Sequence, residues 1–158
     1  MGEVALLRAS GRVVVVDTTG VSGAQVLGNA TQLARAVRNL LDNAAQHGGL
    51  NVAITLSEES GQAELRVTDD GAVIPVQLQE QVFERFARVD QARAAIQGFD
   101  GQRFNGRGAN RRGVSRTGGS GLGLAIAREL IEAHGGIIMV DSDHSPGAHF
   151  VVRLPLNR

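Results

Sequence analysis

Three polar side chains recur at four-residue intervals within one helical pattern of the sequence. Asn39, Asn43 and His47 would share one stripe of that helix, with Gln46 beside it. An asparagine carbonyl is a hard oxygen ligand, which suits a Mg²⁺ ion that keeps waters and phosphate oxygens as its other ligands. The stripe is equally compatible with the polar edge of an ordinary amphipathic helix, so the spacing alone leaves both interpretations open.

A carboxylate ends the second of two alternating segments. Asp69 continues the face of the apolar residues that precede it at two-residue spacing, so it is predicted to point toward the core. A buried carboxylate is costly unless it meets a donor, which indicates a binding role. Its neighbour Asp70 is expected to cap its own turn, at Gly71.

A glycine-rich stretch from Thr117 to Leu124 opens a second helical pattern. Glycines let the backbone approach a ligand closely, and a helix N-terminus offers free N–H groups, so this stretch predicts a phosphate site. It lacks the Gly-Lys-Ser/Thr of a P-loop, and the segment before it does not have the pattern of the strand that precedes a dinucleotide fingerprint. Glycine-rich helix entries also occur for packing alone.

The segment before that stretch is basic and has no periodicity. Residues 85 to 116 contain eight arginines and two aspartates. A loop as long as about residues 88–118 inside a compact domain is usually functional or disordered. Beside a phosphate site it could close over an anion, although most charge runs are simply solvated.

Composition excludes several classes of protein. The 158 residues suit a single domain, residues 1–158, and contain neither cysteine nor lysine, which rules out disulfides, thiolate metal sites and lysine chemistry. A formal net charge of zero and five Phe as the only aromatic residues argue against nucleic acid as a partner. No apolar stretch approaches the ~20 residues of a membrane span, and the start of the chain does not resemble a signal peptide.

The elements that must position these residues follow from periodicity and turn signals. Strands are predicted over 12–17, 137–140 and 148–154, and a hairpin over about 52–67 is joined through 58–61; residues 18–28 are expected to form a loop. Helices are predicted from a cap at Asn29 or Thr31 to about Gln46, over roughly 77–87, and over 121–133. This order predicts a two-layer α/β sandwich with a mixed sheet and helices on one face.

Taken together, these features resemble the catalytic domain of histidine kinases in the GHKL ATPase superfamily. The segments that match, in the order of the family, are Leu33 to His47 (N box), Val67 to Pro75 (first glycine box), Val82 to Arg88 (F box), Gly118 to Leu130 (second glycine box) and Pro146 to Phe150 (last glycine motif). The resemblance implies a mostly antiparallel sheet of about five strands under three helices, with an ATP lid over about 88–118 whose hinge is anchored by Phe83 and Phe86.

The resemblance also implies roles for individual residues. Asn43 would ligate Mg²⁺ with Asn39 beside it, Asp69 would accept from the adenine amino group, and Arg85 or Arg88 would reach the phosphates. The remaining residues implied in nucleotide binding are His47, Gly71 and Ile74 near the base, and Gln46, Gly119, Ser120, Gly121, Leu122 and Gly123 on the phosphate side. Two positions depart from the family pattern. Val73 replaces a glycine, where a positive φ would be strongly disfavoured, and Gln46 replaces a frequent Lys or Arg.

The implied function is to bind Mg-ATP and donate its γ-phosphate to a histidine on a separate dimerisation and phosphoacceptor domain, with a response regulator as an indirect partner. The chain is expected to be a monomeric, cytoplasmic piece of a kinase whose parent is anchored in the membrane. Its four histidines do not match the phosphoacceptor pattern, so it should not phosphorylate itself.

Four other functions compete with this interpretation. An ATP-hydrolysing machine or an anti-sigma-factor serine kinase would need a Glu at the position of Asn39 to activate its nucleophile. A degenerate module without kinase activity, marked by Val73 and Gln46, is the principal alternative. A nucleic-acid arm in the arginine-rich segment is disfavoured because it lacks aromatics.

Overall fold

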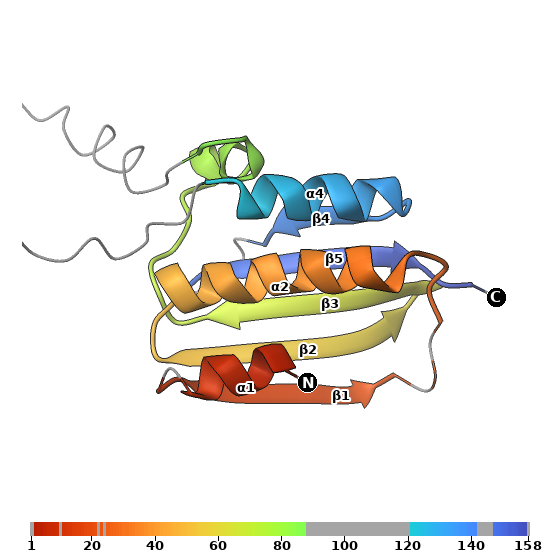
Figure 1. The fold of residues 1–158 in the computed structure, drawn as a ribbon, viewed down its shortest axis with the longest axis horizontal. Helices are drawn as coiled ribbons and strands as arrows, with labels where there is room; N and C mark the ends of the chain where they lie inside the picture. The colour runs from red at the N-terminus through yellow and green to blue at the C-terminus, as the bar shows by residue number, and fades with distance from the viewer. Residues whose placement is uncertain are drawn as a thin grey trace, which may run out of the picture.

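A five-stranded sheet carries its helices on one face (Figure 1). The computed structural model describes residues 2–9, 11–21, 23, 25–87, 121–141 and 147–157. The strands are β1 (Val13–Gly20), β2 (Asn51–Glu59), β3 (Gln62–Asp69), β4 (Ile137–Val140) and β5 (His149–Pro155). The helices are α1 (Gly2–Ala9), α2 (Ala30–His47) and α4 (Gly123–Ala133), with single 3-10 turns η1 (Val76–Leu78) and η2 (Gln81–Phe83).

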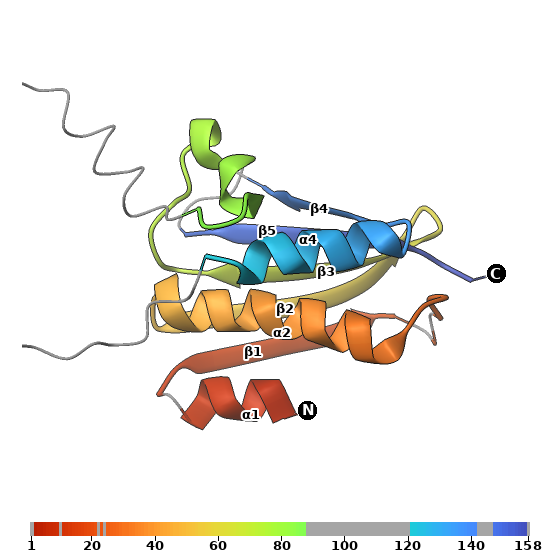
Figure 2. The ribbon, with the colours of Figure 1, turned by 45° about the horizontal axis from the view of Figure 1, so that its top comes forward.

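The sheet is mixed and mostly antiparallel, as predicted. Its order is β1-β2-β3-β5-β4; only β1 and β2 run parallel, and the other three pairs are antiparallel. Helices α2 and α4 lie side by side, with α2 over β3 and α4 over the edge strand β4, and α1 lies over β1 (Figure 2). The predicted two-layer sandwich with three helices on one face is therefore confirmed for the described residues.

Helix α2 begins at an asparagine cap. The Asn29 side chain accepts from the main-chain nitrogens of Thr31 and Gln32, so Asn29 is the cap and Thr31 lies inside the helix. The helix ends at His47, and Gly48 is its C-cap. Its buried residues fall at helical spacing and face the sheet; they are Ala36, Leu40, Leu41 and Ala44.

The hairpin of β2 and β3 closes on a two-residue turn. Ser60 and Gly61 both adopt positive φ, 51° and 80°, which matches the right-handed twist of the flanking strands. The predicted connection at 58–61 was too long, because residues 58 and 59 still belong to β2. Ile54 pairs with Val67, and both are buried beneath the helices.

The helix predicted over about 77–87 does not form. This segment contains only the two 3-10 turns η1 and η2. Pro75 precedes the first turn, Glu84 is extended with ψ 148°, and Phe86 has φ 65°, so helical dihedrals cannot continue. The predicted loop at 18–28 is also shorter, because Thr18 to Gly20 extend β1.

Helix α1 was not foreseen from the sequence. Its eight residues are too few for periodicity to distinguish them from other structure. Arg8 donates from Nη2 to the main-chain oxygen of Val14, 3.2 Å away, and Val4 packs against the core. The helix thereby covers part of the edge strand β1. No helix in the described part of the chain is long and apolar enough to cross a membrane.

A histidine connects the end of α4 to the start of α2. His134 accepts at Nε2 from the main-chain nitrogen of Asn29, 3.0 Å away, and its Nδ1 lies 2.6 Å from the Leu130 carbonyl. A Cβ atom on Gly28 would lie only 2.3 Å from the His134 ring. These contacts hold the C-terminal end of α4 against the N-terminal end of α2, so the two helices run antiparallel.

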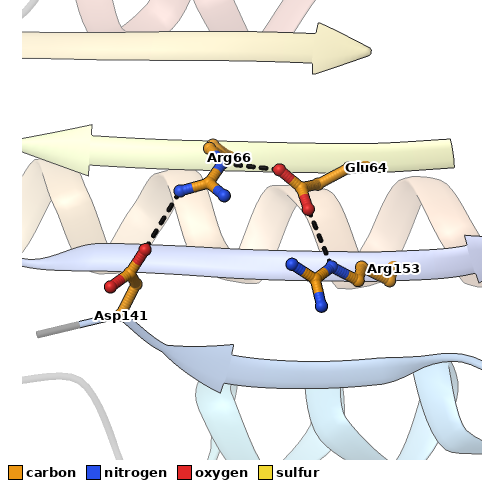
Figure 3. A network of polar contacts seen from close by, with 4 residues as sticks. All are labelled: Glu64, Arg66, Asp141 and Arg153. Atoms are coloured by element: carbon orange, nitrogen blue, oxygen red, sulfur yellow. Dashed lines mark hydrogen bonds and ion pairs between the residues drawn. The ribbon is translucent and has the colours of Figure 1, made fainter. Parts of the chain in front are cut away.

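The opposite face of the sheet carries an ion-pair network (Figure 3). Glu64 is only 4% exposed and accepts from Arg66 Nε at 2.5 Å and from Arg153 Nε at 2.7 Å. Arg66 also donates to Asp141 at 3.1 Å. Burial opposes ionisation of Glu64, but the hydrogen bonds from Arg153 and Arg66 outweigh it and hold the Glu64 pKa below its ordinary value.

Candidate functional site

A buried carboxylate lies where β3 ends. Asp69 is 6% exposed, and its Oδ1 accepts from the main-chain nitrogen of Gly71 at 2.8 Å. Its main-chain nitrogen donates to the carbonyl of Ala148 at 3.0 Å, which ties the end of β3 to the start of β5. Burial raises the Asp69 pKa, although main-chain N–H groups of Gly71 and Ala148 favour the ionised form. The inward direction predicted from strand alternation is confirmed.

Three glycines surround Asp69. A Cβ atom on Gly71 would lie 2.7 Å from the His47 carbonyl oxygen and 2.8 Å from Asp69 Oδ1. On Gly48 it would lie 2.9 Å from Asp69 Cβ, and on Gly147 1.6 Å from the Asp69 carbonyl oxygen. The end of α2, the end of β3 and the segment before β5 therefore meet at this carboxylate, and only residues without side chains fit between them.

Two of these glycines were not recognised as site residues from the sequence. The sequence analysis does not single out Gly48, and it includes Gly147 only within the last glycine motif, Pro146 to Phe150. Each of these glycines lies next to the end of a predicted helix or strand. The sequence does not show that these ends meet, because that depends on the strand order of the sheet. The glycine that the sequence did predict, Gly71, lies at the same place.

The sequence predicts that Asp70 caps its own turn, but its side chain bonds elsewhere. Its carboxylate accepts from the main-chain nitrogen of Asn51 at 2.9 Å and from Asn51 Nδ2 at 2.5 Å. These hydrogen bonds lower the Asp70 pKa. The prediction was wrong because the start of β2 lies directly beside the end of β3 in the antiparallel register, which places better donors within reach than the local turn does.

The asparagine stripe of α2 faces the start of α4. Asn39 and Asn43 are half-buried, whereas Gln46 and His47 are exposed. A Cβ atom on Gly123 would lie 3.9 Å from Asn39 Cβ and Cγ. Among the described residues, Asn39 Nδ2 is buried without a hydrogen-bond partner. A buried amide donor left unpaired costs about 1–3 kcal/mol, so this group is available to a ligand.

The entry to α4 is formed by backbone without a side-chain cap. Gly121 has φ 67°, and Leu122, at the N-cap, makes no side-chain hydrogen bond to the helix. The carbonyl of Gly121 accepts from the Phe86 nitrogen at 2.9 Å, which joins the two segments that flank the predicted lid. Of the site residues predicted here, Arg88, Gly119 and Ser120 lie outside the described residues, as does the segment 88–118.

Arg85 is paired with an acidic residue of α4. Its Nε and Nη2 lie 3.2 and 2.5 Å from Glu129 Oε1, and both side chains are more than half exposed. Phe83 is buried and packs edge-to-face on Phe150, with ring centroids 6.2 Å apart, whereas Phe86 is exposed. The two aromatic residues predicted at the hinge therefore have different environments.

Val73 and Ile74, two apolar residues that follow Gly71, differ in their exposure to solvent. Ile74 is buried and belongs to the core cluster, and Val73 is exposed. Among the described residues, the positive φ values of non-glycine residues belong to Ser60 and Phe86. Val73 therefore does not adopt the left-handed conformation that the glycine of the family pattern could adopt. Its backbone is not strained by the replacement.

The described residues contain no group of three or more His, Cys, Asp or Glu side chains that could hold a metal ion. A cation bound beside α2 could take the amide oxygen of the half-buried Asn43 as one of its ligands. The rest of its coordination would come from water and from the bound molecule. This arrangement suits Mg²⁺, which retains waters and phosphate oxygens.

Comparison with protein families and curated proteins agrees with this geometry. Residues 28–158 match the family model described as histidine kinase-, DNA gyrase B-, and HSP90-like ATPase. The probable sensor histidine kinase TcrY of Mycobacterium tuberculosis is 40% identical over 133 residues, which are 82% of this chain and 23% of the relative. The histidine-protein kinase/phosphatase MprB of a Mycobacterium species is 39% identical over 142 residues, again 23% of its length. The chain thus spans about a quarter of these relatives.

Solved structures show the same fold. The mycobacterial sensor histidine kinase MprB superposes with a TM-score of 0.70 and 31% identity, covering 99% of this chain and 91% of that one. The catalytic domain of histidine kinase ThkA gives a TM-score of 0.69 at 23% identity, over 96% of this chain and 83% of that one. Full-length ShkA in complex with AMPPNP gives 0.68 at 21%, over 98% of this chain and 29% of that one. At these lower identities the likeness concerns the fold alone.

Proposed function

The chain belongs to the histidine kinase-, DNA gyrase B-, and HSP90-like ATPase family, and we propose that it binds Mg-ATP and donates the γ-phosphate to a histidine on a separate dimerisation and phosphoacceptor domain. Its relatives at 38–40% identity are named as sensor histidine kinases or histidine-protein kinase/phosphatases. A response regulator would be an indirect partner. The isolated domain would be monomeric, and in the parent protein, which would be anchored in the membrane, it would lie in the cytoplasm.

The observation that carries this proposal is the placement of two polar groups along one helix. Near the end of α2, Gly48 packs against the buried carboxylate of Asp69. Nine residues earlier, the unpaired Asn39 amide faces Gly123 at the start of α4. At 1.5 Å per residue these points lie about 13 Å apart along the helix. One end offers a fixed acceptor for an amino group and the other offers donors near an uncapped helix N-terminus, which together suit an adenine nucleotide.

Base recognition would rest on Asp69. Its Oδ1 is fixed by the Gly71 nitrogen, which leaves its second oxygen to accept from the exocyclic amino group of adenine. His47 and Ile74 would line the region around the base, whereas Gln46 would stand at a position that faces the phosphates. Guanine carries a carbonyl oxygen in place of that amino group, so it would place an acceptor against a carboxylate and bind poorly.

Phosphate binding would combine α2 and α4. Asn43 would supply a carbonyl oxygen to Mg²⁺, whose role is to neutralise phosphate charge, with Asn39 beside it. The backbone from Gly119 to Gly123, including Ser120 and Leu122, would donate to phosphate oxygens, and Arg85 or Arg88 would pair with them. Because these groups position and stabilise charge, no residue of this chain needs to form a covalent intermediate.

The proposal is tested first by nucleotide binding. A non-hydrolysable ATP analogue at 100 times its Kd stabilises a protein by about 2.7 kcal/mol, which for a domain of this size raises the thermal midpoint by roughly 5–11 °C. The shift should need Mg²⁺ and should be lost in Asn43→Ala. No shift at millimolar analogue would favour a degenerate module without nucleotide.

Phosphotransfer is tested with a separate protein. The chain should phosphorylate a histidine-containing dimerisation domain of a related kinase in the presence of Mg-ATP. The chain itself should carry no acid-labile phosphohistidine afterwards. Stable labelling of one of its own histidines, or fast ATP hydrolysis without an acceptor, would contradict the proposed transfer.

A further inference from the structure

Arg85, which the proposed function assigns to the phosphates, forms an ion pair with the carboxylate of Glu129. That carboxylate would compete with a phosphate for the guanidinium. Both Nε and Nη2 of the guanidinium face one oxygen of Glu129, at 3.2 and 2.5 Å. Arg85 makes no other hydrogen bond among the described residues. An arginine held in this way must leave Glu129 before it can form a bidentate contact with a phosphate.

Arg85 begins within reach of the phosphate end of the site. The next residue, Phe86, donates its main-chain N–H to Gly121, just before α4 begins at Gly123. Glu129 lies six residues further along α4, about 9 Å along the helix axis. The Arg85 side chain therefore extends away from the helix entry, along the outer surface of α4, to reach its carboxylate partner.

The pair is well suited to exchange because it is exposed. The side chains of Arg85 and Glu129 are 65% and 57% exposed, and ion pairs of this kind are weak and screened by water. A triphosphate offers a denser negative charge than one carboxylate does. The neighbouring segment is held independently, since Phe83 is buried and Arg128 pairs with Glu80 at 3.2 Å. Arg85 can change partners without displacing that segment.

We propose that Glu129 is a positioning residue that withholds Arg85 from the nucleotide and yields it to the terminal phosphate when a triphosphate binds. This inference rests on the proposed function of the site. The consequence is selective: Glu129 should weaken binding of a triphosphate, whose γ-phosphate attracts Arg85, and should leave the affinity for the diphosphate product nearly unchanged.

The test compares Kd values for AMP-PNP and ADP with the full chain in Mg²⁺, measured by calorimetry. Glu129→Gln should bind AMP-PNP roughly two- to fivefold more tightly than the wild type, the range that an exposed ion pair can supply. Its affinity for ADP should change by much less. Glu132→Gln is the matched control, because Glu132 lies on the same helix and pairs with Arg128 instead.

A double substitution isolates the role of Arg85. In an Arg85→Gln background, Glu129→Gln should no longer alter AMP-PNP affinity, because there is no guanidinium to release. The inference is overturned if Glu129→Gln leaves AMP-PNP affinity unchanged, tightens ADP equally, or keeps its effect without Arg85. If the wild type binds neither nucleotide, the proposed function fails, and this inference fails with it.

Discussion

The carbonyl oxygen of Asp69 occupies the space that a side chain on Gly147 would need. A Cβ atom at residue 147 would lie 1.6 Å from that oxygen, and the backbone there has φ 100°. This contact brings the segment that leads into β5 against the end of β3, at the carboxylate proposed to read the base. Close approach and left-handed backbone both require glycine at this position.

Gly147→Ala is therefore expected to destabilise the domain by about 3 kcal/mol or more, because overpacking adds to the cost of positive φ. Chemical denaturation monitored by circular dichroism would measure the loss. Gly23→Ala is the matched control, since Gly23 has φ 86° and no atom of the described residues lies within 4 Å of the added Cβ. It should lose only about 1–2 kcal/mol; equal losses at both positions would show that the contact with Asp69 is unimportant.

Asp69→Asn should increase the stability of the free domain while abolishing its response to nucleotide. Burial raises the folded-state pKa of Asp69 above 3.8. The ionised carboxylate therefore disfavours folding as the pH rises through that pKa, and the penalty reaches its full size above it. Asparagine can keep the hydrogen bond from Gly71 without the charge, and a gain of about 1 kcal/mol is expected.

Unfolding free energies between pH 4 and pH 8 would check this sign. The advantage of Asp69→Asn should be largest at neutral pH and should shrink as the solution approaches the ordinary carboxyl pKa of 3.8. A variant less stable than the wild type at pH 7 would mean that the carboxylate charge supports the fold and is not retained for binding.

Glu64→Gln should destabilise the domain in the opposite pH sense. The Glu64 pKa is lowered, so its stabilisation is present above the ordinary value of 4.5 and is lost as the pH falls through the folded-state pKa. Loss of a buried ion pair costs about 3–5 kcal/mol; because both arginines are about a third exposed, about 1–3 kcal/mol is expected at pH 7.

The control for Glu64 is an exposed carboxylate. Glu132→Gln removes the 2.8 Å contact of Glu132 with Arg128, where the Glu132 side chain is 53% exposed, and should cost at most about 0.5 kcal/mol. Urea denaturation of both variants at pH 7 and near pH 4 would separate them. If the loss of stability caused by Glu64→Gln did not diminish in acid, the ion pairs of Glu64 with Arg66 and Arg153 would not be its cause.

Phe83→Ala should cost about 3–5 kcal/mol, whereas Phe86→Ala should change stability by less than about 0.5 kcal/mol. Phe83 is 5% exposed, packs on Phe150 and lies beneath the Arg128 guanidinium, 5.6 Å from the ring centre; Phe86 is 71% exposed. Thermal midpoints would measure both. If the two variants were equally unstable, the ring of Phe86 would have to pack against the domain in solution.

Most strands and both long helices were predictable because their signals are local. The apolar spacing of α2 and the alternation in β2 and β3 depend only on which face a neighbouring layer covers. The asparagine cap at Asn29 and the turn at Gly61 depend on backbone donors within a few residues. The failures were also local: α1 is too short for its period to show, and the conformations of Glu84 and Phe86 prevent a helix whose apolar residues had the right spacing.

The candidate site was only partly predictable from the residues themselves. The alternation that leads to Asp69 placed its carboxylate inward, and helical spacing placed Asn39 and Asn43 on one stripe. The resemblance to the family assigned them to the two ends of a nucleotide. The partners of Asp70 and Arg85 were not accessible in this way, since Asn51 and Glu129 are 19 and 44 residues distant along the chain.

The sequence by itself determined the periodic elements, the inward direction of Asp69 and the spacing of the asparagine stripe, because these follow from covalent geometry and from burial of one face. Only the tertiary structure decided what those groups meet. The strand order brings Gly147 onto Asp69, and the antiparallel packing of α2 and α4 brings Asn39 to Gly123. Such contacts depend on how distant segments pack around a shared core, which no local pattern encodes.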